Sequence, residues 1–158
     1  MIATDLQASP NATPLQCPLA VVFDTNVLLS LFVFADSRFA PLLGAVDAGH
    51  WRAYSNTACF AEFRRVLGYP AFALDSAQQD AAAAAWQNRL LWSTPVTVNA
   101  SALPQCKDRD DQKFLELARD AGADWLISAD KALLKLARRD KLRGLFHILT
   151  PEAAMAHL

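Results

Sequence analysis

The chain has 158 residues, a length that suits one domain with a sizeable core. Hydrophobic residues make up 53% and charged residues 20%, but no uncharged apolar stretch reaches about 18 residues, which argues against a membrane protein. The formal net charge of −1 excludes a generally basic surface, so any nucleic acid must be bound by a local patch.

The chain divides into two regions by composition. Residues 1–18 are polar and rich in proline, which predicts a flexible N-terminal arm. Residues 19–158 contain regular apolar patterns and no internal repeat, so we expect them to form a single folded domain.

Predicted strands alternate with predicted helices along this domain. Short apolar runs predict strands at 19–23, 51–55, 94–98, 125–128 and 145–149. Helical spacing, capping residues and stops at glycine or proline predict helices at 26–34, 41–48, 58–67, 76–92, 111–120, 131–139 and from 151 onward. The alternation predicts an α/β fold, a three-layer α/β/α sandwich around a central, mainly parallel sheet.

Four acidic residues occupy distinctive places in this pattern. Asp24 and Asp130 each follow a predicted buried strand, so they lie at the same edge of the sheet if the two strands are neighbours. Asp111 begins a helix at the end of an apolar stripe, and Glu62 lies on the apolar side of its helix. Carboxylates are costly at such places without a cation, so the simplest explanation for gathering them is a divalent metal ion.

Each acidic residue also has a purely structural interpretation. Asp24 and Asp130 could cap the helices that follow them, and Asp111 could be favoured by the dipole of its own helix. Glu62 could pair with a local cation such as Arg65. Two acidic residues precede Asp111, and each could be a cap or a further metal ligand: Asp108 and Asp110.

A ring of several carboxylates suits Mg²⁺ or Mn²⁺, because Mg²⁺ keeps most of its waters and binds few protein oxygens directly. One or two ions could be held, and in two-metal sites the ions lie roughly 3.5–4 Å apart and clamp a phosphodiester. The histidines are scattered and the cysteines Cys17, Cys59 and Cys106 are widely spaced, which argues against a zinc site or a disulfide framework and favours a reducing cytoplasm.

With these residues identified, the sequence resembles the PIN-domain family over roughly residues 19–155. The segments that carry the resemblance are Val21-Val22-Phe23-Asp24-Thr25-Asn26-Val27, then 61–67 around Glu62, 108–118 around Asp111, 122–131 around Asp130, and the closing Leu149-Thr150-Pro151-Glu152. The ordered set is more specific than any single segment.

The resemblance implies a Mg²⁺- or Mn²⁺-dependent ribonuclease, closest to the toxin components of bacterial toxin–antitoxin pairs. Its catalytic and metal-binding residues would be Asp24, Glu62, Asp111 and Asp130. Asn26 and Ser128 would be the supporting polar residues at the same site. The resemblance further implies an RNA substrate, an antitoxin protein as partner and a homodimer.

Basic residues near the acidic set could contact RNA. Lys131 and Lys135 share a helix face that starts beside Asp130, and Arg64 lies in the helix of Glu62. The alternative is that these residues form an ordinary solvated face. A rival function is a catalytically weak PIN-like scaffold that binds RNA or a protein, which loss of metal-dependent cleavage in Asp24→Asn would separate from an enzyme.

Overall fold

The computed structural model describes residues 18–158, so the predicted arm, apart from Pro18, lies outside the described residues. Five strands are present there: β1 Leu19–Phe23, β2 Trp51–Ser55, β3 Leu91–Trp92, β4 Trp125–Ile127 and β5 His147–Leu149. The α-helices of this part are α1 Thr25–Phe32, α2 Ala40–Asp47, α3 Thr57–Leu67, α4 Ser76–Gln87, α5 Gln112–Asp120, α6 Lys131–Leu134 and α7 Pro151–Met155. Short 3₁₀ turns are η1 Ser37–Phe39, η2 Pro70–Phe72, η3 Arg109–Asp111, η4 Lys135–Arg138 and η5 Asp140–Leu142.

The strands form one sheet in the order β3-β2-β1-β4-β5, and every pair in it is parallel. Val21 of β1 is level with Ala53 of β2 on one side and with Trp125 of β4 on the other. The predicted α/β fold with a mainly parallel central sheet is therefore confirmed. Because β1 and β4 are neighbours, their carboxyl ends meet at the same edge of the sheet.

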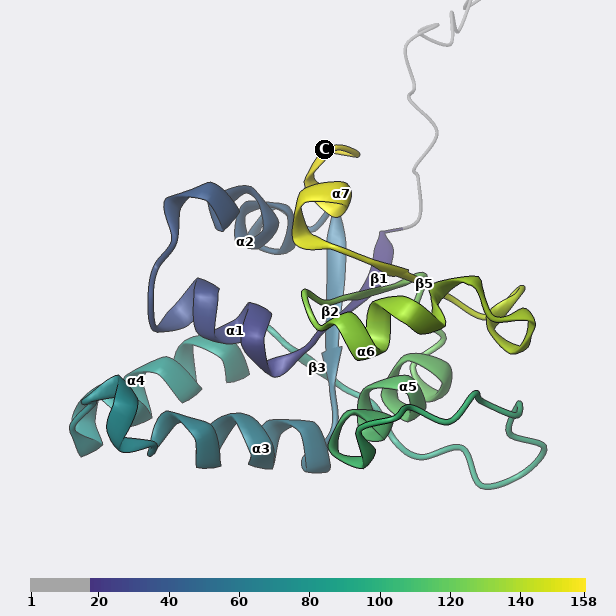
Figure 1. Ribbon diagram of the computed structural model, residues 1–158. Coiled ribbons are helices and arrows are strands. Elements are labelled where there is room, and N and C mark those ends of the chain that lie inside the picture. The colour runs from purple at the N-terminus through teal and green to yellow at the C-terminus, as the bar shows by residue number, and fades with distance from the viewer. Residues whose placement is uncertain (1–17) are drawn as a thin grey trace, which may run out of the picture.

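Helices cover both faces of the sheet, as Figure 1 shows with α1 to α4 on one side of the strands and α5 and α6 on the other. Side chains alternate along a strand, so Val21 and Phe23 of β1 pack in one core while Val22 packs in the other. The first core contains residues of α1 to α4 and α7, and the second contains residues of α5, α6 and the 3₁₀ turns η4 and η5.

One predicted strand was wrong, and one predicted helix ends earlier than expected. The strand expected at 94–98 does not form; β3 is Leu91–Trp92, which pairs with the last two residues of β2. After Ser93, which still donates its N–H to Ser55, β2 offers no further partner, and Pro95 has no N–H to donate. The helix expected at 76–92 accordingly ends at Gln87, which leaves the chain free to enter β3.

The other differences are small. The helix expected at 131–139 is α-helical only over α6, and it continues as the 3₁₀ turn η4.

Within residues 18–158 no single helix is long and apolar enough to cross a membrane. The helix α1 and the segment Ser37–Asp47 pass that test only as a pair, which is bent by 109°. Cys59 and Cys106 are free, and burial raises the pKa of the Cys59 thiol to about 12, so this thiol is not poised as a nucleophile.

Candidate active site

An acidic cleft of about 330 Å³ opens at the carboxyl edge of the sheet. The predicted acidic residues Asp24, Glu62, Asp111 and Asp130 all line it. Two further carboxylates, those of Asp108 and Asp110, line it as well, together with the side chains of Thr25, Asn26, Leu29, Val66, Tyr69, Phe72 and Phe114. Residues more than 100 positions apart in sequence are thus brought together by the neighbouring ends of β1 and β4.

Asp24 is fixed at the junction of β1 and α1. Its Oδ1 accepts the N–H of Val27 at 2.9 Å, so it caps α1 as the structural interpretation required. Its Oδ2 accepts a hydrogen bond from the Ser128 hydroxyl, and the residue is only 3% exposed. A carboxylate oxygen has more than one lone pair, so capping and metal binding by Asp24 are compatible.

Ser128 connects two of the acidic residues. Its hydroxyl donates to Asp24 and accepts the backbone N–H of Asp130 at 2.9 Å, and its side chain is fully buried. Asp130 uses Oδ1 to cap α6, accepting the N–H groups of Ala132 at 2.7 Å and Leu133 at 3.3 Å. Ser128 therefore holds the turn after β4 against the end of β1.

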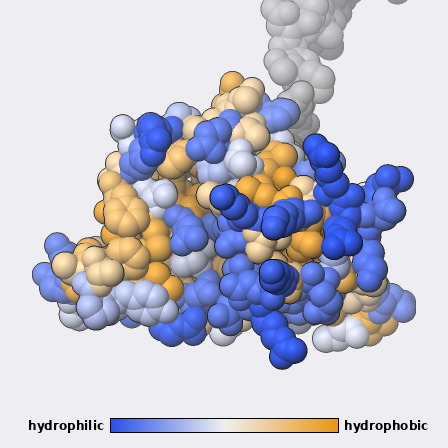
Figure 2. Space-filling view, in the orientation of Figure 1, coloured by the Kyte–Doolittle hydropathy of each residue, from blue (hydrophilic) through white to orange (hydrophobic). Residues whose placement is uncertain are grey.

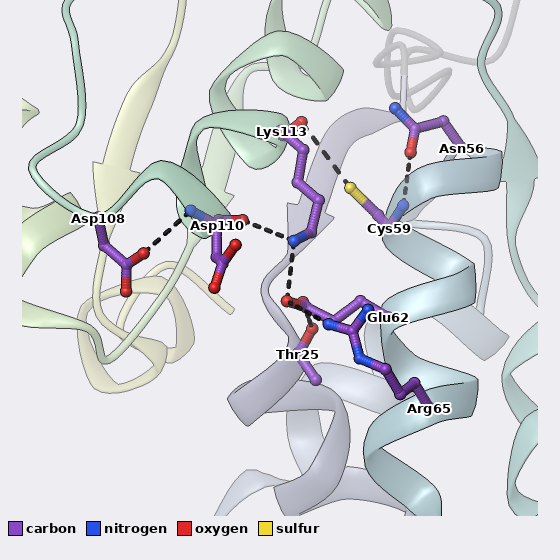
Figure 3. A network of polar contacts seen from close by, with 8 residues as sticks. All are labelled: Thr25, Asn56, Cys59, Glu62, Arg65, Asp108, Asp110 and Lys113. Atoms are coloured by element: carbon purple, nitrogen blue, oxygen red, sulfur yellow. Dashed lines mark hydrogen bonds and ion pairs between the residues drawn. The ribbon is translucent and has the colours of Figure 1, made fainter.

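Glu62 enters the cleft from α3, whose start is capped by Asn56 (Figure 3). Its Oε1 accepts a hydrogen bond from Lys113 Nζ at 2.8 Å, and its Oε2 accepts the hydroxyl of Thr25. Arg65 is a more distant ion-pair partner, with 3.9 Å between Nη2 and Oε1. The cation expected beside Glu62 is therefore chiefly Lys113, which lies 51 residues away in sequence.

Asp111 lies where η3 passes into α5, at the N-cap position of α5, but its side chain makes no capping hydrogen bond. Its Oδ2 is buried and has no hydrogen-bond partner among the residues that the structure describes. Asp108 performs the local capping instead, because its Oδ1 accepts the N–H of Asp110 at 2.9 Å. A buried carboxylate oxygen without a partner calls for an explanation, and a bound ion or water would supply one.

The electrostatics of the cleft reflect crowded negative charge. Burial raises the pKa of Asp24 to about 6, and the nearby carboxylates of Asp130 and Glu62 add to the rise against the lowering effect of the hydrogen bonds. Burial likewise raises the pKa of Asp111 to about 6, followed by the repulsion from Asp130, Asp108, Asp24 and Glu62. A cation placed between these groups would relieve both effects.

The donor set of the cleft fits a hydrated divalent ion. It consists of carboxylate oxygens, the ligands that Mg²⁺ and Mn²⁺ prefer, and it includes the unpartnered oxygen of Asp111. No group of three or more histidine, cysteine or acidic side chains in residues 18–158 is already arranged closely enough to hold a metal ion. Mg²⁺ keeps several waters of its own, and such waters can link it to carboxylates that do not bind it directly.

The other predicted residues lie in different places. Asn26 is exposed and lines the cleft. Lys131 on α6 and Lys135 on η4 are exposed, and neither lines the cleft. Figure 2 shows mostly hydrophilic side chains on the surface over these two elements. Arg64 does not line the cleft either, and its Nη1 pairs with Asp80 of α4 at 3.1 Å.

Sequence reasoning did not assign Lys113, Tyr69 or Phe72 to the site. Lys113 binds the Glu62 carboxylate, as Thr25 does from its position beside Asp24, and Tyr69 and Phe72 form part of the wall. The three unassigned residues come from the segment after α3 and from α5, where no sequence pattern distinguishes them from ordinary surface residues.

Comparison with protein families gives a match to a domain family. The sequence model of the PIN domain matches residues 20–132, a range that runs from β1 into α6 and contains all four predicted acidic residues. No curated protein matches the chain.

Proposed function

This chain belongs to the PIN-domain family, whose members are generally nucleases that use divalent metal ions, and on that premise we propose that it is a Mg²⁺- or Mn²⁺-dependent endoribonuclease. It would hydrolyse phosphodiester bonds of RNA. The observation that carries the proposal is the convergence of all four predicted carboxylates on one cleft at the carboxyl edge of the sheet. The unpartnered oxygen of Asp111 in that cleft supports a cation as the missing partner.

The side chains of the cleft would have two roles, metal binding and orientation of the metal ligands. Asp24, Asp111 and Asp130, with Glu62, would hold one or two ions. When bound, the metal lowers the pKa of the attacking water and offsets charge on the phosphate. Ser128 fixes Asp24 and the turn of Asp130, so that these two carboxylates are oriented before any ion arrives. Thr25 orients Glu62 in the same way from the start of α1.

The wall of the cleft supports unpaired RNA as the substrate. Tyr69 is 46% exposed, and it lines the cleft beside Phe72. The Phe72 ring packs against that of Phe34, which is 61% exposed, with 5.7 Å between the ring centroids. Figure 2 shows hydrophobic side chains on the surface over the end of α1, where Phe34 follows the helix. Aromatic rings beside a phosphate-binding site are typical platforms for unstacked bases.

A catalytically weak PIN-like scaffold that binds RNA or a protein is the second candidate. It is favoured by one observation, that no metal-binding cluster is already assembled in the described residues. The two functions differ in what metal removal does. A scaffold would retain RNA binding in a chelator and would not cleave, whereas the enzyme would lose cleavage and regain it when Mn²⁺ is restored.

The direct test is cleavage of a mixed-sequence, single-stranded RNA by purified protein with Mn²⁺, with a chelator, and with the variant Asp24→Asn. Asparagine keeps an oxygen to accept the Val27 N–H, so the cap of α1 is preserved while a negative charge is removed. Asp124→Asn is the matched control, because Asp124 lies outside the cleft and accepts the Ala20 N–H at 2.9 Å through a bond that asparagine can also make. We expect cleavage by the wild type and the control only.

The family resemblance also leads us to propose a setting for the enzyme. It would be the toxin of a toxin–antitoxin pair, silenced by a cognate antitoxin protein, and it would form a homodimer. Light scattering tests the homodimer, since a mass of one 17.3 kDa chain at working concentration would contradict it.

A further inference from the structure

Lys113 pairs with Glu62, one of the carboxylates that line the acidic cleft. Six residues with carboxylates line the cleft, and its lining contains no lysine or arginine among the described residues. Lys113 reaches Glu62 from α5, with its side chain only 21% exposed. Its Nζ donates to Glu62 Oε1 at 2.8 Å and to the backbone carbonyl of Asp110 at 2.6 Å (Figure 3).

The ammonium group is held from several directions. Its Nζ lies 5.6 Å from the centre of the Phe114 ring. The backbone carbonyl of Lys113 accepts a long hydrogen bond from the Cys59 thiol, with 3.8 Å between sulfur and oxygen, which joins α5 to α3. Lys113 therefore lies at the contact between the two helices that deliver Glu62 and Asp111, and its position is defined by the fold.

Both oxygens of Glu62 already have partners. Lys113 occupies Oε1, and the Thr25 hydroxyl occupies Oε2. Each oxygen has a second lone pair, but a divalent ion that binds Glu62 approaches a carboxylate on which one cation is already present. Two cations close together on the same carboxylate repel each other strongly in a partly buried site.

We propose that Lys113 is a built-in counter-ion of the cleft, which neutralises Glu62 before metal binds and competes with an incoming divalent ion for that carboxylate. The inference rests on the proposed function. Lys113 acts on the metal through Glu62, and it weakens metal binding by competing for that carboxylate. The Asp110 carbonyl gives the displaced ammonium a remaining partner at the cleft wall.

This role makes a prediction opposite to that of a purely structural lysine. If Lys113 only orients Glu62, its loss would leave the carboxylate misplaced and weaken metal binding. If it competes with the metal, its loss removes a repelling charge and tightens metal binding. The direction of the change in Mn²⁺ affinity therefore separates the two roles without any measurement of RNA cleavage.

The experiment is a calorimetric titration of Mn²⁺ into the wild type, Lys113→Met, Lys113→Gln and Lys113→Arg, with circular dichroism to confirm folding. Lys113→Gln keeps a donor for the Asp110 carbonyl, so it remains informative if Lys113→Met does not fold. Lys107→Met is the control, because Lys107 is exposed, precedes η3 and makes no ion pair among residues 18–158. We expect the neutral variants at position 113 to bind about tenfold more tightly, and Lys113→Arg and Lys107→Met to resemble the wild type.

The outcomes separate this inference from the proposed function when Asp24→Asn is titrated alongside. Binding by the wild type that is lost in Asp24→Asn supports the metal site whatever the Lys113 variants do. Unchanged or weaker binding by folded Lys113→Met and Lys113→Gln would then overturn the counter-ion role alone. Absence of binding by the wild type and all the variants would overturn both.

Discussion

The two edges of the central sheet carry different side chains. The amino edge has the larger hollow, about 670 Å³, lined by the starts of β1, β2 and β4, by α2 and by the C-terminal residues. Trp51, Trp125 and His157 contribute rings to it, and no acidic side chain of the described residues lines it. The carboxyl edge has a cleft of about 330 Å³ that six residues with carboxylates surround.

The difference follows from the direction of the strands. At the carboxyl edge α1 begins directly after β1, and α6 begins close after β4, so N-terminal backbone N–H groups point toward this edge and favour acidic caps such as Asp24 and Asp130. At the amino edge the chain arrives from helix ends and buries apolar rings. Under the proposed function, the chemistry lies at the ends of the parallel strands and not in the larger hollow.

The largest expected effect is at Asp111. We expect Asp111→Asn to lower metal-dependent RNA cleavage by about 100-fold or more, because it removes a charged oxygen that has no other partner in the described residues. Single-turnover cleavage assays measure the loss, and Asp124→Asn at the amino edge is the control. Comparable losses in the two variants would erase the distinction between the edges.

Ser128→Ala should have the next largest effect. Removing this hydroxyl frees the Asp24 carboxylate and leaves the partly buried N–H of Asp130 without its acceptor. We expect Mn²⁺ affinity to fall about 10- to 100-fold and the free energy of unfolding to fall by about 1–3 kcal/mol. Ser55→Ala, at a buried serine that ends β2 at the same edge, should leave Mn²⁺ affinity unchanged. Equal effects of the two variants on affinity would show that Ser128 is merely part of the packing.

The stability of the metal-free protein should depend on pH through Asp24 at the carboxyl edge. A carboxyl whose pKa is raised from 3.8 to about 6 by folding, as for Asp24, binds more protons in the folded state between these values, so its ionisation lowers the stability of the metal-free protein as pH rises through that window. The melting temperature of Asp24→Asn minus that of the wild type should therefore increase between about pH 4 and pH 6 and stay constant above pH 6.

Metal binding should show the complementary trend. Because Mn²⁺ requires ionised carboxylates, its affinity for the wild type should fall as pH drops below about 6, by about tenfold per pH unit for each carboxyl that must lose a proton. Calorimetric titrations between pH 5 and pH 7.5 would measure this. A flat profile would contradict the assignment of Asp24 and Asp111 as ligands.

A smaller effect is expected at the aromatic wall. Tyr69→Ala should weaken binding of single-stranded RNA by about 1–3 kcal/mol without changing Mn²⁺ affinity, because it removes a stacking surface and no ligand. Fluorescence anisotropy with a labelled oligonucleotide measures the change, and His157→Ala, which removes an exposed ring at the amino edge, is the control. A loss in both variants or in neither would place RNA elsewhere.

The smallest effect concerns the exposed lysines. If Lys135 contacts the RNA backbone, Lys135→Gln should reduce the slope of log affinity against log salt by about 1 and should weaken all RNA sequences equally. An unchanged slope would favour the solvated-face interpretation of α6 and η4. Arg64 is a less promising contact, because it is already paired with Asp80.

Much of this architecture could be predicted because it depends on local patterns. The apolar runs before Asp24 and Asp130 define β1 and β4, and their caps define where α1 and α6 begin. The strand at 94–98 was wrong because apolar residues alone do not make a strand; β3 requires a partner, and β2 ends at Ser55. Lys113 could not be predicted as the partner of Glu62, since only the packing of α5 against α3 brings them together.

The proposed function requires that the carboxyl edge binds a divalent ion through Asp24 and its neighbours. A calorimetric titration of Mn²⁺, extended to millimolar concentration, into the wild type, Asp24→Asn and Asp124→Asn tests this binding without knowledge of the RNA target. We predict binding by the wild type and Asp124→Asn that is strongly weakened in Asp24→Asn. Equal binding by all three folded proteins, or binding by none, would contradict the claim and favour the scaffold.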